Sequence, residues 1–502
     1  MTSSNTSSNH PADRTLRSAA GALLTALVAV PCLGLIFFAP LAGRAAYDMV
    51  RFHVPVVRTF AADLPAPDLT DYLSATTPGY HLLLAPIARV APEALWPLQL
   101  VGLVPALLLA WVLGRSIARR TGEVFSAVLL GGPACCSAYV LLSGAFVLPD
   151  AAGWLGVLLV LLIALRVAEG DVRLRWFVVG GLALLGLAMV RQIHVWAAAA
   201  LWTAAWWSAG GSGLGDALTT RVPTRLRRAL AMVLASAPAF AAIGVFVWVW
   251  GGLTPPTFRG QYPPGLNLAA PAFTLALTGA LGLIFAGWWI PSAWGSLTAG
   301  RERAEARVGL AIAVGLSLLA AVAVATSYDK DAGRWSGLWN LAQRLPAPAD
   351  RSPLIMGFAV LGGVTVWAVT YQFQACVRWT LLAAGLAFMV AQAAGHELWQ
   401  RYAEPMVLLW LALALAASAG DRASSRHAMA GPVWALLGLW RACGPALFVA
   451  ASVALVGVRV GRAPPLGEID PSAPLPWQME AADDSAVIDS DSAASLDGTV
   501  GP

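Results

Sequence analysis

Long apolar runs recur along almost the whole of this 502-residue sequence. Hydrophobic residues make up 58% of the chain and charged residues 12%, whereas soluble domains carry roughly 25% charged residues. A helix of about 20 apolar residues is long enough to cross the hydrocarbon core of a bilayer. The sequence is therefore predicted to fold as an all-α polytopic membrane protein.

We place about thirteen membrane-spanning helices on these runs, within one transmembrane domain at residues 14–460. The runs lie near residues 18–41, 94–114, 124–142, 150–167, 176–190, 194–209, 229–250, 268–291, 308–326, 354–371, 379–394, 403–419 and 433–458. Residues 1–13, rich in Ser, Thr and Asn, are predicted to be a disordered cytoplasmic segment, and residues 461–502 a disordered acidic tail. The first loop, residues 42–93, is expected to be large and to contain short interfacial helices.

Arginine is concentrated in alternate loops, such as residues 115–120 and 221–228, and cytoplasmic loops of membrane proteins are normally basic. This pattern predicts a multi-pass protein with a cytoplasmic N-terminus and an extracytoplasmic first loop. The same rule explains the net charge of +5, so we expect membrane lipids and no nucleic acid as partners. Lys330 is the only lysine, and this arginine-rich composition is typical of a GC-rich bacterium, which places the protein in the bacterial inner membrane.

The first loop carries the densest set of ionisable residues, from Tyr47 to His81. Asp48 follows the first apolar run and could act as a general base on an acceptor hydroxyl at the membrane surface. It could equally be an interfacial carboxylate that pairs with Arg44 or Arg51.

Three further ionisable sites fall at predicted outer ends of spans. Asp150 is either a favourable first residue of a helix or part of the same outer cavity as Asp48. Arg191 is either a ligand for an anionic lipid phosphate or a snorkelling residue in a turn. Arg401 is a second outer cation, for which an internal pair with Glu404 is the alternative.

Several familiar catalytic signatures are absent from the sequence. It has no phosphate-binding Walker loop, no HExxH zinc motif, no GxSxG elbow and no CxxC pair, and its five cysteines lack zinc-ligand spacing. We therefore expect no metal ligands and no cofactor, although a divalent cation stays open. A chemistry in this chain would use a membrane-borne activated substrate or would move a solute.

Three stretches resemble multi-spanning glycosyltransferases of the GT-C class, and most closely the dolichyl-phosphoglucose-dependent α-1,2-glucosyltransferase family. They are Asp48 with Phe52-His53-Val54-Pro55 and Thr76-Thr77-Pro78-Gly79-Tyr80, then Arg191-Gln192-Ile193-His194-Val195-Trp196, and Arg401-Tyr402-Ala403-Glu404-Pro405. The chain departs from the family pattern at Met49, where the family has Glu. Asp48 also stands one residue further from Phe52, and one residue on an α-helix turns a side chain by about 100°.

The resemblance implies an inverting hexosyltransferase at the outer face. Its donor would be a polyprenyl-phosphate sugar, and its acceptor a lipid-linked glycan or a cell-envelope polymer. Asp48 would be the catalytic base, and Arg191 and Arg401 would bind the donor phosphate. The resemblance also implies a set of substrate-binding residues, which are His53, Thr76, Thr77, Tyr80, Asp150, Gln192, His194 and Tyr402.

Two other functions remain open on the sequence alone. A transporter or flippase of a lipid-linked saccharide would also need many helices and an outer polar mouth, but such proteins often contain internal repeats, and none is evident here. A scaffold subunit would leave Asp48 and Arg191 without a role.

Overall fold

The computed structural model describes residues 11–211, 214–261, 265–298, 303–420 and 431–467. Within these ranges every regular element is helical, and the only β pairing is two isolated bridges, Ala42 with Pro465 and Asp329 with Arg334. In chain order, with η1 a π-helix and η2 to η5 3₁₀-helices, the elements are α1 (Pro11–Phe38), α2 (Gly43–Asp48), η1 (Met49–His53), α3 (Val54–Ala62), α4 (Gly79–Val90), α5 (Trp96–Thr121), α6 (Val124–Cys135), α7 (Ala138–Ala145), α8 (Asp150–Ala168), α9 (Leu174–Val190), η2 (Gln192–Ala197), α10 (Ala198–Trp207), α11 (Leu214–Thr219), α12 (Val222–Trp250), η3 (Pro256–Gln261), α13 (Ala270–Gly282), η4 (Leu283–Phe285), α14 (Ala286–Thr298), α15 (Arg303–Val322), α16 (Leu338–Ala342), η5 (Pro348–Asp350), α17 (Pro353–Thr370), α18 (Ala375–Ala393), α19 (Gln400–Gly420) and α20 (Pro432–Arg462).

The described chain is a polytopic helical protein with fewer clear spans than the sequence predicts. Nine of its helices are long and apolar enough to cross a membrane, and the bent pair α6–α7 would make ten. The prediction of about thirteen spans is not confirmed. At 1.5 Å per residue, the 17 residues of α9 extend about 26 Å, less than a hydrocarbon core of about 30 Å. The run at 124–142 is bent by 71° between α6 and α7, which an apolar pattern does not reveal.

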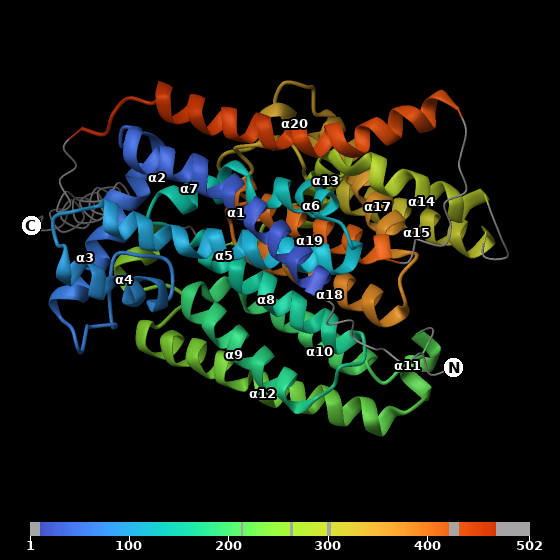
Figure 1. Ribbon diagram of the computed structural model, residues 1–502, viewed down its shortest axis with the longest axis horizontal. Coiled ribbons are helices and arrows are strands. Elements are labelled where there is room, and N and C mark those ends of the chain that lie inside the picture. The colour runs from blue at the N-terminus through green and yellow to red at the C-terminus, as the bar shows by residue number, and fades with distance from the viewer. Residues whose placement is uncertain (1–10, 212–213, 262–264, 299–302, 421–430, 468–502) are drawn as a thin grey trace, which may run out of the picture.

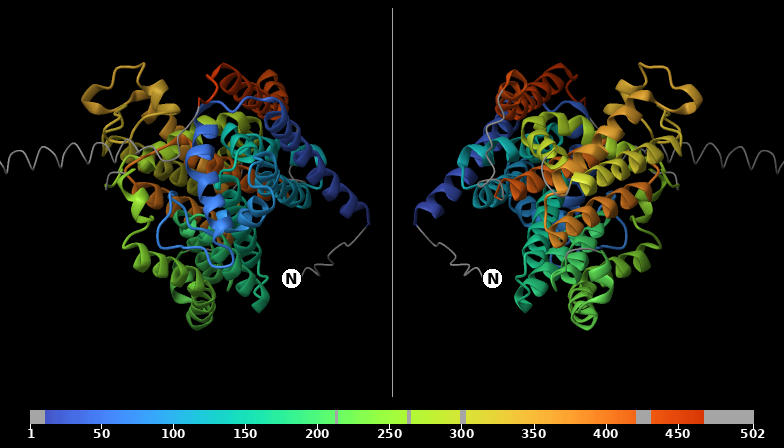
Figure 2. Two further views of the ribbon diagram at one scale, coloured as in Figure 1. Left: turned by 90° about the vertical axis from the view of Figure 1, so that its left-hand side faces the viewer. Right: turned by 90° about the vertical axis from the view of Figure 1, so that its right-hand side faces the viewer.

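Helix α19 passes through the middle of the bundle (Figure 1). Its residues 403–416 are all buried, as expected of a helix that is apolar on nearly every side. Helices α9 and α12 pack together at one edge of the bundle, and α20 lies along the opposite edge in all views (Figures 1 and 2). Helix α19 is therefore surrounded by other helices of the bundle along most of its length.

Helices α13 and α17 approach each other closely through glycine. A Cβ atom added to Gly279 would lie 2.1 Å from the Phe358 carbonyl oxygen, and one added to Gly362 would lie 1.9 Å from that of Leu275. Small residues at such crossings let the two helix backbones approach closely. In a bilayer this packing drives helix association, because the hydrophobic effect does not favour helix contacts over lipid contacts. Larger side chains at either position would force the two helices apart.

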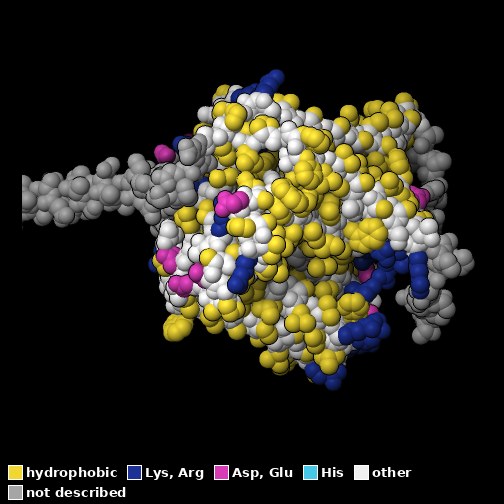
Figure 3. Space-filling model, turned by 60° about the vertical axis from the view of Figure 1, so that its left-hand side comes forward, with side chains coloured by type: hydrophobic (Ala, Val, Ile, Leu, Met, Phe, Trp, Pro, Cys, Tyr) yellow, Lys and Arg dark blue, Asp and Glu magenta, His cyan; other side chains and the backbone are white. Residues whose placement is uncertain are grey.

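The surface has the character of a membrane protein. Figure 3 shows a broad hydrophobic band, with a cluster of Lys and Arg at its lower right and acidic and basic side chains together at its left. Large apolar side chains such as Leu234 on α12 and Leu316 on α15 are exposed. A soluble monomer rarely exposes so large an apolar surface, which agrees with a bilayer around the bundle.

The segment between α1 and α5 contains the short helices α2, η1, α3 and α4. Its start is joined to the end of the described chain, because the Leu466 N–H donates to the Leu41 carbonyl at 2.9 Å. At the N-terminus, α1 begins at Pro11, so residues 11–13 are helical and the prediction of disorder is wrong for these three residues. Residues 1–10 and most of the predicted acidic tail, 468–502, lie outside the described residues.

Candidate functional site

A polar cavity lies where segments far apart in the sequence meet at one end of α19. Its volume is about 50 Å³. Its lining comes from the short helices of the first loop, the starts of α8 and α19, the end of α9, and η3. The lining residues are Arg44, Asp48, Phe52, His53, Ser74, Ala75, Thr76, Leu148, Pro149, Asp150, Arg191, Phe258, Arg401 and Tyr402.

The cavity is charged and slightly positive. Its wall holds three guanidinium groups, of Arg44, Arg191 and Arg401, and two carboxylates, of Asp48 and Asp150. With every group in its usual ionised form, the wall carries one excess positive charge. Low-dielectric walls strengthen the field of such a cleft, so a singly charged anion is the favoured ligand.

Asp48 joins the first loop to α19. Its Oδ1 accepts a hydrogen bond from Arg44 Nε at 3.0 Å, and its Oδ2 accepts one from Arg401 Nη1 at 3.1 Å. The Arg44 side chain is 64% exposed, so that pair contributes little, whereas Arg401 and Asp48 are largely buried. A carboxylate has about four lone-pair sites, so Asp48 can still accept a proton from a third group.

The backbone after Asp48 widens into a single π turn, η1. A π turn holds more residues than an α turn, and such turns occur mostly as insertions inside α-helices. This turn lies between Asp48 and His53, which is where the chain has one residue more than the family pattern it resembles. Asp48, Phe52 and His53 all line the cavity, while Met49 is fully buried in the core.

Arg191 forms an ion pair with Asp150 across the cavity floor. The Arg191 Nη1 donates to Asp150 Oδ1, and the two side chains are only 12% and 21% exposed. Asp150 is the first residue of α8, where the helix dipole also favours a negative charge. Both interpretations of Asp150 therefore hold, because it begins α8 and also lines the cavity.

Tyr402 lies against both cavity arginines. The guanidinium carbon of Arg191 is 4.9 Å from the centre of the Tyr402 ring, and that of Arg401 is 4.7 Å from it. Trp399 stacks on Tyr402 at 5.6 Å and also lies 4.4 Å from Arg401. Aromatic faces attract cations, and a stacked guanidinium loses less freedom on binding an anion. The start of α19 thus holds two guanidinium groups ready for one ligand.

His53 and His81 form a pair beside the cavity. The His53 Nδ1 and His81 Nε2 atoms are 3.0 Å apart, and the two rings are stacked at 5.2 Å. Burial, together with the nearby positive charges of Arg191 and Arg401, lowers the pKa of His53 to about 3. Burial also lowers the pKa of His81 well below its usual value, with His53 as the next cause. Both rings are therefore neutral at physiological pH.

Three predicted substrate-binding residues form hydrogen bonds with other groups of the protein. Thr76 lines the cavity, and its hydroxyl lies 3.1 Å from that of Ser74. The Thr77 hydroxyl donates to the Ala188 carbonyl at 2.7 Å. The Gln192 amide nitrogen donates to two backbone carbonyls at 2.7 and 2.8 Å, and its oxygen accepts from the Thr77 N–H at 3.1 Å. These bonds fasten the first loop to the end of α9.

Two other predicted residues lie behind the wall. Tyr80 is 3% exposed, and its hydroxyl meets no hydrogen-bond partner among the described residues. His194 is also 3% exposed and packs 4.7 Å from Trp154, without a partner for either ring nitrogen among those residues. Neither residue lines the cavity.

Glu404, the alternative partner predicted for Arg401, forms its hydrogen bonds with other residues. Its Oε1 accepts from the Ser137 hydroxyl and its Oε2 from the Gln400 amide, both at 2.7 Å. Arg401 instead donates to Asp48. The internal pair of Arg401 with Glu404 is therefore not formed, and the cation is turned into the cavity.

Sequence reasoning missed three participants. Phe258 reaches the cavity from η3 and packs on Phe52 with ring centres 5.6 Å apart. Nothing local in the sequence marks it, because its contact spans about two hundred residues. Ser74 was hidden in a polar loop, and His81 was visible only as one of several histidines near outer span ends.

No group of three or more His, Cys, Asp or Glu side chains with metal-binding geometry occurs among the described residues. The charged groups of the cavity are dominated by arginine, which binds anions and does not ligate cations. The cavity wall thus offers two separated carboxylates, each already held by a guanidinium group.

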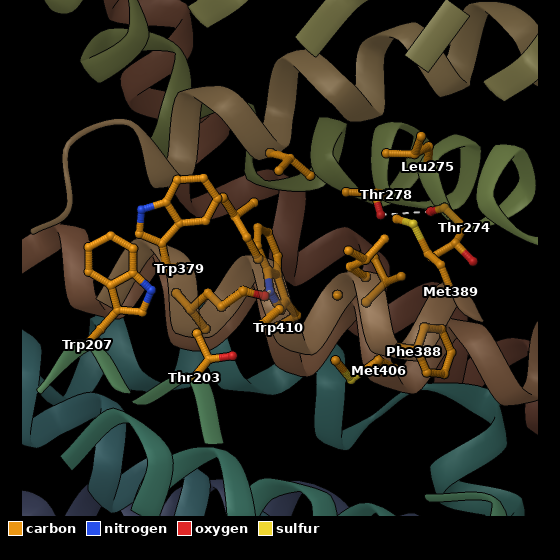
Figure 4. A pocket seen from close by; sticks show the side chains of 17 residues that line it. Thr203, Trp207, Thr274, Leu275, Thr278, Trp379, Phe388, Met389, Met406 and Trp410 are labelled. Atoms are coloured by element: carbon orange, nitrogen blue, oxygen red, sulfur yellow. Dashed lines mark hydrogen bonds between the residues drawn. The ribbon is translucent and has the colours of Figure 1, made fainter. Parts of the chain in front are cut away.

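A larger, apolar cavity lies further along α19 (Figure 4). Its volume is about 440 Å³, and it lies between α10, α13, α17, α18 and α19. Two of its polar groups bond within the protein: Thr278 donates to the Thr274 carbonyl at 2.8 Å, and Trp410 donates to the Leu381 carbonyl at 2.9 Å. The Thr274 hydroxyl meets no hydrogen-bond partner among the described residues. This cavity has no charged lining residue.

Comparison with known proteins assigns no family. No protein-family model matches the sequence, and no curated protein matches it. Among solved structures, the chain matches the crystal structure of ArnT from Cupriavidus metallidurans bound to undecaprenyl phosphate. The two share 16% sequence identity over 88% of this chain and 77% of the other, with a TM-score of 0.39. A likeness at this TM-score carries no inference about this chain.

Proposed function

We propose that this protein is an integral-membrane glycosyltransferase that moves a hexose from a polyprenyl-phosphate sugar to an acceptor hydroxyl at the polar cavity. One observation carries the proposal. The three stretches that resemble GT-C glycosyltransferases, around Asp48, Arg191 and Arg401, lie far apart in the sequence yet contribute to one cavity wall. A scaffold subunit has no need of such convergence.

The donor is matched to the cavity by charge. A sugar phosphodiester carries a single negative charge, and the wall carries one excess positive charge. Arg191 and Arg401 bind its phosphate oxygens through charge-assisted hydrogen bonds, which are stronger than neutral ones. Asp150 and Tyr402 hold the Arg191 side chain in place through the ion pair and the ring contact.

The transfer is an inverting displacement. Asp48 accepts the proton of the acceptor hydroxyl, whose oxygen forms a bond to the anomeric carbon. The bond from that carbon to the phosphate oxygen breaks on the opposite side, and its electron pair stays with the polyprenyl phosphate. The leaving phosphate gains negative charge in the transition state, where Arg191 and Arg401 stabilise it.

The acceptor is a hydroxyl of a lipid-linked glycan or cell-envelope polymer, reached from the outer face of the bacterial inner membrane. Thr76 and His53 line the cavity mouth and offer polar contacts to a sugar. Asp48 lies on the first-loop side of the cavity and Arg191 on the α8–α9 side. This arrangement allows acceptor and phosphate to approach from two directions.

A transfer assay on reconstituted protein tests the proposal. Purified protein in liposomes receives undecaprenyl-phosphate glucose labelled in the sugar, together with lipids extracted from bacterial membranes as a source of acceptor. We expect labelled sugar in a new product and stoichiometric release of undecaprenyl phosphate. Movement of the labelled lipid between leaflets without product would instead identify a flippase. If neither product nor lipid movement is observed, both functions are refuted.

A further inference from the structure

We propose that His81 is a positioning residue that fixes the tautomer of His53, so that His53 presents a neutral Nε2–H donor to an anionic phosphate oxygen in the polar cavity. The phosphate part of this inference rests on the function proposed above. The tautomer part stands on the geometry of the two rings alone.

The His53 ring has one nitrogen on each side of the cavity wall. Its Nδ1 lies 3.0 Å from His81 Nε2, and the ring lines the cavity. Its Nε2 is not among the buried atoms that lack a partner in the described part of the chain. The nitrogen on the accessible side is therefore Nε2.

The surroundings of His81 decide which nitrogen carries the proton. His81 is fully buried, and its Nδ1 meets no hydrogen-bond partner among the described residues. The rings around it are apolar faces or edges, with Phe60 at 6.3 Å, Tyr72 at 6.3 Å and Tyr80 at 5.9 Å. A hydrogen on Nδ1 would be a buried donor without an acceptor, which proteins avoid more strictly than an under-used acceptor.

His81 therefore carries its hydrogen on Nε2 and donates it to His53 Nδ1. A neutral imidazole has one donor and one acceptor nitrogen, so an accepting Nδ1 requires the hydrogen of His53 to be on Nε2. A cationic His53 would be buried near Arg191 and Arg401, and a cationic His81 would be buried beside His53, which disfavours both. The lowered pKa values of both histidines agree with neutral rings.

A neutral donor at this point complements the two arginines. Arg191 and Arg401 already supply the charge that a phosphodiester needs. A further cation, added to the three guanidinium groups of the wall, would make the empty cavity harder to form and the product phosphate harder to release. An Nε2–H donor adds a directed hydrogen bond without adding charge.

The ¹⁵N NMR spectrum of histidine-labelled protein in nanodiscs tests the tautomer. The His53 signals are identified by their loss in the H53Q variant. We expect a protonated Nε2 and an unprotonated Nδ1 in His53 of the native protein. His81→Phe keeps an aromatic ring of similar size and removes the donor, so His53 should then lose this single tautomer. His81→Gln retains an N–H near the same place and should restore it at least in part.

The phosphate contact is tested on the same samples. Undecaprenyl phosphate and, in a parallel sample, inorganic phosphate are added while the His53 Nε2 signal is followed. A shift with either probe supports the contact, and a shift with the lipid alone assigns it to the lipid-linked phosphate. No shift with either probe overturns it.

Each outcome separates this inference from the proposed function. An Nδ1–H or cationic His53 in the native protein overturns the tautomer, whatever the transfer assay shows. If His81→Phe does not fold, the native spectrum and His81→Gln still decide the question. A native Nε2–H tautomer together with no sugar transfer would refute the proposed function alone.

Discussion

The two cavities along α19 differ in volume and in the charged side chains that line them. At the start of the helix, Arg401 and Tyr402 face a cavity of about 50 Å³ with five charged side chains. Further along, Met406 and Trp410 face a cavity of about 440 Å³ with none. A drug-like ligand would fit the larger cavity better, yet only the smaller one can hold an anion or move a proton. Size therefore does not identify the site.

The difference arises from how each cavity is built. The polar cavity is closed by loops and helix ends, where polar side chains reach partners from distant segments. The apolar cavity is bounded by the middles of five helices, where a charge inside a membrane is costly unless it is paired. The following predictions are ordered by expected effect, and each one would strengthen or remove this contrast.

The largest effect is expected at Asp48. Asp48→Asn removes the proton acceptor but keeps the size and a hydrogen-bonding oxygen, so sugar transfer should fall by about 10²- to 10⁴-fold. Binding of undecaprenyl phosphate, measured by native mass spectrometry, should persist. Asp63→Asn is the matched control, because Asp63 is exposed in the same loop and does not line the cavity. Full transfer activity in Asp48→Asn would remove the catalytic base from the account.

A smaller loss is expected at the arginines. A hydrogen bond to a charged group contributes about 1.5–3 kcal/mol, so Arg401→Gln should weaken binding of undecaprenyl phosphate by about 10- to 100-fold. For Arg191, the double variant Arg191→Gln/Asp150→Asn avoids leaving a buried carboxylate unpaired. Arg58→Gln, an exposed change in the first loop, is the control. Unchanged affinity in both cavity variants would show that the phosphate binds elsewhere.

A change in the apolar cavity should matter less. A Cβ atom at Gly385 would meet nothing closer than Trp410 Nε1 at 4.0 Å, so Gly385→Leu can fill space there. Transfer should fall by less than about tenfold, which is about 1.4 kcal/mol, because no charged contact is touched. The transfer assay decides this directly. A loss as large as that of Asp48→Asn would mean that the two cavities act together.

The last prediction concerns stability at low pH and not the rate of sugar transfer. The folded pKa of His53 is about 3 and that of an unfolded histidine is about 6.5, so folding favours the neutral ring. Its contribution to stability is complete above pH about 6.5 and is lost as the pH falls toward 3. The charged and titratable groups that face the pair are Arg191, Arg401, Tyr72 and Tyr80.

The thermal melting temperature in detergent, measured between pH 7 and pH 4, checks this dependence. It should fall on acidification in the native protein and fall less in the His53→Gln/His81→Gln variant. Equal slopes would show that the two histidines do not take part in the acid sensitivity.

The sequence predicts the class of fold well and the helices less well. Apolar runs identify the helices because membrane burial requires about 20 such residues. They do not show the bend between α6 and α7 or the short reach of α9, since both depend on packing and not on hydrophobicity.

The candidate site was likewise only partly predictable from the sequence. Asp48, Arg191 and Arg401 stand out because ionisable residues beside apolar runs are rare. Their meeting in one cavity is tertiary, and so is the place of Phe258 in its wall. The other predicted residues are distinguished only by the fold, which turns Gln192 to backbone groups and buries His194 against Trp154.

The π turn shows how a local departure from a pattern can be resolved. By sequence, the extra residue between Asp48 and Phe52 leaves the direction of Asp48 open. In the structure the π turn η1 follows Asp48, and Asp48 reaches Arg401, which lies 353 positions away along the chain. No periodicity rule predicts a π turn, because its cost is met by contacts that form only in the folded protein.

A structure of the protein in nanodiscs with undecaprenyl phosphate bound tests the central claim most directly. The account predicts the phosphate in the polar cavity, with its oxygens within hydrogen-bond distance of Arg191 and Arg401 and beside the His53 ring. A phosphate bound outside this cavity, with Arg401 still donating to Asp48 and Arg191 to Asp150 and neither touching the lipid, would contradict it.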